Sequence, residues 1–192
     1  KNSSSTATYF GVYNFNNDKS SNSTFGFSEG CESWEFSNNT SPRCLFQSDD
    51  FSNKDDVLTD FEARYPKDYT DTTNLEKLVK WIVSCDSTKA TNNSFEPVEI
   101  NGEVYSADTS EYRIAKFKYE LPIYFNQDFV LTYYIVSEFF GMVDSRAKNM
   151  FLNLYNTGIW YPVFYDLDTI IGLNNEGVNN FNFNIEYHDS IG

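Results

Sequence analysis

The sequence predicts an α+β fold, with a small strand-rich amino-terminal part and a helical carboxy-terminal part. Large side chains alternate near the amino terminus, and apolar residues recur at helical spacing in the second half. The 192 residues suit one domain and can bury a core. We expect a flexible end at 1–8 and a single domain over 9–192, strand-rich over 9–60 and helical over 61–192. We also expect the chain to be a fragment of a longer protein.

The amino-terminal part carries the predicted strands. Tyr9–Phe15 alternates large residues and is bounded by Asn and Ser, which is typical of a strand. Residues 25–36 hold aromatic side chains at mostly even spacing and predict one or two further strands. Residues 37–56 are mostly polar and predict a loop.

Two helices follow. Thr73 opens a capping-box pattern, and the apolar residues after it share one face, so we expect a helix over 74–84. Ser110 can cap a second helix over 111–121, which Pro122 should end. The second helix should turn Ile114, Phe117 and Leu121 inward.

The longest apolar-periodic run, residues 127–140, predicts a third helix. Asn126 or Asp128 can cap its start, and Gly141 can end it in a left-handed conformation. Apolar side chains cover nearly its whole circumference, and a helix that is apolar all round is buried. We therefore expect a core helix.

Two hairpins are predicted from turn residues between apolar runs. Asn101-Gly102 marks a small hairpin within the loop 86–107. Met150–Tyr155 and Ile159–Tyr165 flank Asn156-Thr157-Gly158 and predict the second.

Polar side chains follow the third helix and the second hairpin. Asp144 and Asn149 lie five residues apart after the helix, and Asp166 and Asp168 follow the hairpin. We expect these four to face one cavity, where hard oxygen ligands suit Mg²⁺. Protein kinases use the same order of an Asp-x4-Asn loop and a metal-binding Asp at a strand end. Asp144 would then orient or deprotonate the acceptor hydroxyl, and Asn149, Asp166 and Asp168 would hold the metal.

Two stretches, Phe140–Asn149 and Ile159–Asp168, resemble the core of the spore-coat CotH kinase family. The Gly-Val-Tyr of Tyr9–Phe15 is similar to a strand in the family's amino-terminal lobe. The family has an atypical protein-kinase-like fold and phosphorylates Ser or Thr. The resemblance implies ATP and Mg²⁺ as cofactors and a protein substrate. For the phosphate-pairing lysine, Lys19 is the nearest candidate after the first strand.

The stretch Tyr161–Thr169, followed by Gly172–Gly177, looks closer to a branch found in large virion proteins of tailed phages. This resemblance implies a virion location, in a tail or collar protein, with other virion proteins as partners in a homo-oligomeric assembly. A bacterial cell surface or spore coat is the alternative location. Thr169 stands where the bacterial enzymes have Trp.

Charge and composition narrow the function classes. A net charge of −14 argues against wrapping nucleic acid and against docking on anionic membranes. No apolar run reaches the roughly 18 residues that a membrane span needs. Cys31 and Cys44 could form a bridge, but with Cys85 we expect free buried thiols. The lone His188 gives little support to His-based catalysis.

Each site residue also has a plain structural interpretation. Asp144 can cap a turn and Asn149 can satisfy loop backbone. Arg146 and Lys148 can pair with the carboxylates and stabilise an inactive pocket. Three functions therefore stay open: an active kinase, a catalytically silent structural or host-attachment module, and a carbohydrate-binding module that relies on divalent ions.

Overall fold

The computed structural model describes most of the chain. The described residues are 18–92, 96–142, 145, 147–167, 170, 171, 173 and 178. Outside them lie several residues that the sequence singled out: the strand Tyr9–Phe15, Asp144, Arg146, Asp168, Thr169, Gly172 and His188.

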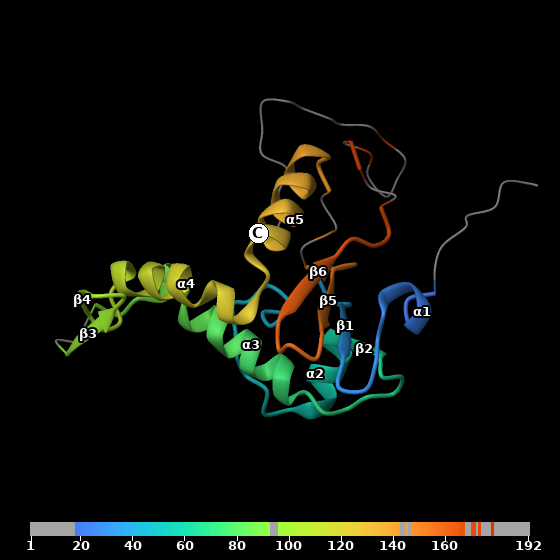
Figure 1. The fold of residues 1–192 in the computed structure, drawn as a ribbon, viewed down its shortest axis with the longest axis horizontal. Helices are drawn as coiled ribbons and strands as arrows, with labels where there is room; N and C mark the ends of the chain where they lie inside the picture. The colour runs from blue at the N-terminus through green and yellow to red at the C-terminus, as the bar shows by residue number, and fades with distance from the viewer. Residues whose placement is uncertain are drawn as a thin grey trace, which may run out of the picture.

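The described residues contain both helices and antiparallel sheets, which is the composition of an α+β fold (Figure 1). In chain order they are α1 (Asn22–Phe25), β1 (Glu32–Phe36), α2 (Lys54–Asp60), β2 (Phe61–Tyr65), α3 (Thr73–Ser84), a 3₁₀ helix η1 (Ser87–Lys89), β3 (Pro97–Ile100), β4 (Glu103–Ser106), α4 (Ser110–Tyr124), α5 (Gln127–Phe139), β5 (Phe151–Leu154) and β6 (Trp160–Val163).

A four-stranded antiparallel sheet, in the order β2-β1-β5-β6, forms the centre of the fold. The main core contains Trp34 of β1, Leu152 of β5 and Trp160 of β6, together with Leu75 and Leu78 of α3. Burying these large side chains supplies the main driving force for folding. β1 and β5 are the two inner strands of the sheet, and both are buried along their whole length.

The amino-terminal part agrees with expectation only in part. Residues 25–36 supply one strand, β1, where one or two were expected, and they begin with the last residue of the short helix α1, which Ser21 caps and Gly26 ends. The loop expected over 37–56 is wrong at its end, where Asn53 caps α2. The expected division into strand-rich and helical parts is not confirmed, since β2 to β6 all follow residue 60.

Helix α3 has the predicted position, whereas α4 runs through Pro122 instead of ending before it. Pro122 is exposed, so water can reach the carbonyl group that its missing N–H leaves without a donor. Leu121 is buried as expected, but Ile114 and Phe117 are 43% and 38% exposed. The predicted inward face of α4 is therefore wrong in its first half.

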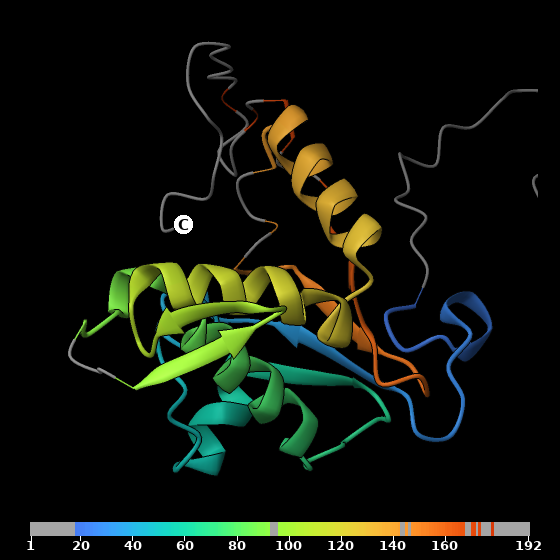
Figure 2. The same ribbon diagram turned by 60° about the vertical axis from the view of Figure 1, so that its left-hand side comes forward.

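Helix α5 has the predicted bounds but not the predicted burial. Asn126 caps it, and Gly141 follows it with φ +56°, the left-handed conformation that favours glycine. Only one side packs against the sheet: Tyr133 and Ser137 are buried, whereas Phe139 is 73% exposed. Figure 2 shows α5 projecting away from the sheet and from α4.

Both hairpins are confirmed as β3–β4 and β5–β6. Cys31, Cys44 and Cys85 are free, buried thiols, and burial raises the pKa of Cys44 to about 12. Within the described residues, no helix has both the length and the apolar character that crossing a bilayer requires.

Candidate functional site

The register of the β5–β6 hairpin places two of the predicted ligands at the same end of the sheet. Phe151 pairs with Val163, so the start of β5 lies beside the end of β6. Asn149 precedes β5 by two residues and Asp166 follows β6 by three. Both residues therefore lie where the chain enters or leaves the sheet at the same end of the two strands, with the whole hairpin between them in sequence.

Asn149 and Asp166 both have a left-handed backbone, with φ of 55° and 54°. Asn and Asp tolerate this conformation better than most residues, and it turns the chain sharply out of the strand direction. The N–H of Asn149 donates to the carbonyl of Phe36 at 3.1 Å, which fixes the loop to the end of β1. Asp166 is exposed, so its carboxylate is accessible to a ligand.

The loop between α5 and β5 is tied down on both sides of Asp144. Before it, the N–H of Met142 donates to the carbonyl of Ser137 at 2.8 Å. After it, the hydroxyl of Tyr133 donates to the carbonyl of Ser145. Ala147 is buried further along the loop. The backbone on both sides of Asp144 is thus held by α5, while Asp144 itself lies outside the described residues.

The donor set fits a hard cation in part. Asn149 and Asp166 offer a carboxamide and a carboxylate oxygen, which are the ligand types that Mg²⁺ prefers. No group of three or more His, Cys, Asp and Glu side chains that could hold a metal ion occurs among the described residues. The convergence of all four predicted residues stays a prediction, because Asp144 and Asp168 lie outside that part of the chain.

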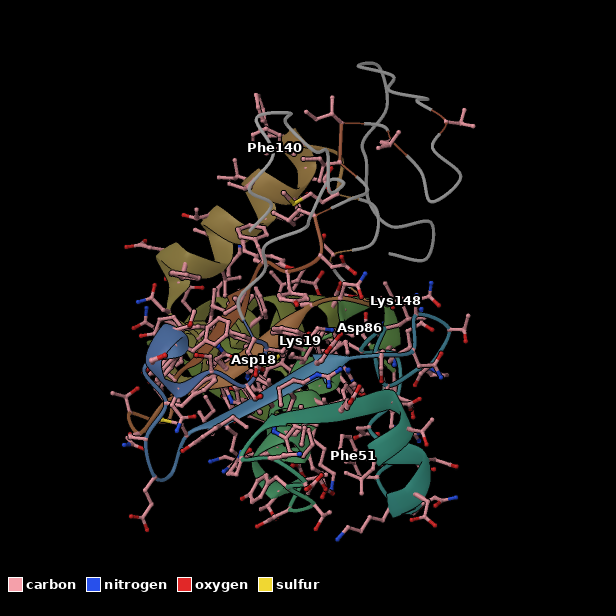
Figure 3. All side chains as sticks on the ribbon, turned by 90° about the vertical axis from the view of Figure 1, so that its right-hand side faces the viewer. Asp18, Lys19, Phe51, Asp86, Phe140 and Lys148 are labelled. Atoms are coloured by element: carbon pink, nitrogen blue, oxygen red, sulfur yellow. The ribbon has the colours of Figure 1, made fainter. Side chains whose placement is uncertain are left out.

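A charged cluster lies at the same end of the sheet, where Glu35 pairs with Phe151, and the sequence did not reveal it. The carboxylate of Glu35 in β1 accepts from Lys19 Nζ at 2.9 and 3.1 Å and from Arg64 Nε at 2.5 Å. Lys19 Nζ also lies 4.7 Å from the ring centroid of Tyr165, directly before Asp166. Figure 3 shows Lys19 beside β1.

The signal for this cluster was the acidic residue inside an aromatic strand. Glu35 stands between Trp34 and Phe36, and a buried carboxylate there requires cationic partners. Arg64 also donates to both oxygens of Glu62, at 2.5 Å each.

Comparison with known proteins gives one family. The family model described as CotH kinase protein matches residues 88–190, which is more than half of the chain. The match includes α4, α5, the loop after α5 and the β5–β6 hairpin. No curated protein and no solved structure matches the chain.

Proposed function

Because this chain belongs to the CotH kinase protein family, we propose that it transfers the γ-phosphoryl group of Mg²⁺–ATP to Ser or Thr hydroxyls of a protein. The observation that carries the proposal is the hairpin register, which brings Asn149 and Asp166 to one end of the sheet beside a loop anchored to α5. We further propose that the domain works in a phage tail or collar protein, with a bacterial cell surface or spore coat as the alternative.

The proposed chemistry divides the work among four residues. Asp144 accepts the proton of the acceptor hydroxyl while the hydroxyl oxygen forms a bond to the γ-phosphorus. The bond from that phosphorus to the β–γ bridging oxygen breaks, and ADP leaves. Asn149, Asp166 and Asp168 would hold Mg²⁺, which would neutralise the charge on the phosphate oxygens. The hydrogen bonds that tie Met142 and Ser145 to α5, on either side of Asp144, support this role for the base.

Labelling of protein from γ-labelled ATP tests this role. Asp144→Asn should lower the rate by about 10²- to 10⁴-fold, because general-base catalysis contributes that much. Asp166→Asn should lower it by weakening metal binding, and excess Mg²⁺ should restore part of the loss. Asp128→Asn, an exposed carboxylate on α5, is the control and should label like the wild type. Equal labelling by Asp144→Asn would show that Asp144 is not the base.

The alternative is a catalytically silent structural or host-attachment module. The observation that favours it is the engagement of Lys19 by Glu35, which neutralises the candidate for the phosphate-pairing lysine. A thermal melt separates the two functions, because a ligand that binds only the folded state raises the melting temperature. A rise with Mg²⁺ and ATP together supports the kinase, and no rise supports the silent module.

A further inference from the structure

Helix α5 presents an apolar ridge to solvent. Leu131, Ile135 and Phe139, here called the α5 ridge, are spaced i, i+4 and i+8 and are 47%, 62% and 73% exposed. They lie on the side opposite the buried Tyr133 and Ser137. Soluble monomers rarely expose a continuous apolar surface of this kind, so it indicates an interaction site.

The apolar surface continues past the end of the helix. The rings of Phe139 and Phe140 meet edge to face, with centroids 5.0 Å apart. The N–H of Ile171 donates to the carbonyl of Phe140 at 2.6 Å, and Ile171 is itself 49% exposed. Phe140 and Ile171 therefore add exposed apolar side chains at the end of α5 where the ridge finishes.

The spacing of the α5 ridge indicates the shape of its partner. A ridge spaced i, i+4 and i+8 is the surface that interdigitates with a second helix. The ridge therefore fits an amphipathic helix that lays its apolar side on α5.

Charge indicates whether a second copy of this chain or a different protein covers the α5 ridge. From Gln127 to Phe139 the sequence has no Lys or Arg, and its charged residues are Asp128 and Glu138. The whole chain has a net charge of −14. A second copy of the chain would meet a like charge, whereas a cationic helix is attracted. We propose that the α5 ridge binds an amphipathic helix of a partner protein whose apolar side is flanked by Lys and Arg.

A synthetic helix tests the proposal. The peptide has about five helical turns, with Leu at i, i+4 and i+8 and Lys on both flanks. A second peptide of the same composition has its Leu residues spread around the helix. Fluorescence anisotropy should detect binding of the first peptide only, and the affinity should fall when salt is raised.

Matched variants locate the binding site. Ile135→Glu should weaken binding by about tenfold or more, because it places a charge in the centre of the contact. Ile123→Glu on α4 is the control, since Ile123 is 61% exposed against 62% for Ile135. It should leave the affinity unchanged, and both variants should melt cooperatively like the wild type.

Three outcomes overturn the proposal. The first is equal binding of the two peptides, and the second is an Ile135→Glu variant that binds as well as Ile123→Glu. The third is self-association in sedimentation experiments that Ile135→Glu abolishes while neither peptide binds, which would make a second copy the occupant. None of these measurements depends on phosphotransfer.

Discussion

Glu35 is a carboxylate whose side chain is only 7% exposed, and its two cationic partners come from distant parts of the chain. Lys19 lies 16 residues before it and Arg64 lies 29 residues after it. No sequence spacing relates the three residues, because only the pairing of β1 with β2 and the path of the chain before α1 bring them together. Asn149 and Asp166 could be predicted to leave the same end of the sheet because one local hairpin connects them.

The Glu35 cluster should contribute measurably to stability. Glu35→Gln leaves two partly buried cations without their common counter-charge, and we expect a loss of about 2 kcal/mol in the free energy of unfolding. The value is below that of a fully buried pair, because the Lys19 and Arg64 side chains are 31% and 22% exposed. Urea unfolding measures it.

The matched control for this cluster is Glu62→Gln. Glu62 pairs with the same Arg64, but its side chain is 52% exposed, so its loss should cost less than about 1 kcal/mol. If Glu35→Gln and Glu62→Gln unfold at the same urea concentration, the Glu35 cluster has no special role in stability.

At the scale of elements, local sequence signals predicted where helices and strands begin and end better than they predicted what packs around them. The bounds of α5 and of the hairpin β5–β6 follow from a cap, turn residues and periodicity within each segment. The position of α3 follows from periodicity alone, since the predicted capping box at Thr73 does not form and Thr72 precedes the helix without a side-chain cap. The burial of α5 does not follow, because a helix that is apolar all round is buried only where other elements cover it. The exposure of the α5 ridge depends on what packs there, which periodicity does not report.

Helix α2 shows a local signal that a polar composition obscured. The Asn53 side chain accepts from the N–H groups of Asp55 and Asp56, and the two carboxylates complement the positive end of the helix. Only Val57 and Asp60 of this helix are buried, so periodicity is weak, whereas the cap is recognisable in the sequence. The cap should therefore account for much of the helix's stability.

Asn53→Ala should lower the free energy of unfolding by about 1 kcal/mol, since it removes the oxygen that accepts these backbone donors. Asn53→Ser keeps a capping oxygen and should recover most of the loss. Chemical denaturation followed by circular dichroism compares the two. A serine variant as unstable as the alanine variant would show that the Asn53 amide acts through its bond to Asp56 rather than as a cap.

At the scale of the whole molecule, one aspartate connects several elements. The Asp108 carboxylate accepts from Thr91 Oγ1 at 2.6 Å and from Arg113 Nε at 2.6 Å. Arg113 in turn donates to the carbonyls of Val83 and Asp86, at 3.3 and 3.2 Å. The end of α3, the segment after η1, the β3–β4 hairpin and the start of α4 thus meet at this group. They lie partly within the region that the CotH family model matches.

The bond from Thr91, and then the bond from Arg113, hold the pKa of Asp108 below its ordinary value of 3.8. A carboxyl with a lowered pKa stabilises the folded state above its unfolded pKa and stops doing so as the pH falls through its folded pKa. Asp108→Asn should therefore lower the melting temperature at pH 7, and the difference from the wild type should shrink below pH 3.8. Acidification also reduces the net charge of −14, which relieves repulsion in both proteins equally, so the difference isolates Asp108. The exposed Asp49→Asn variant should melt like the wild type throughout, and a constant gap between wild type and Asp108→Asn at every pH would contradict the role of the charge.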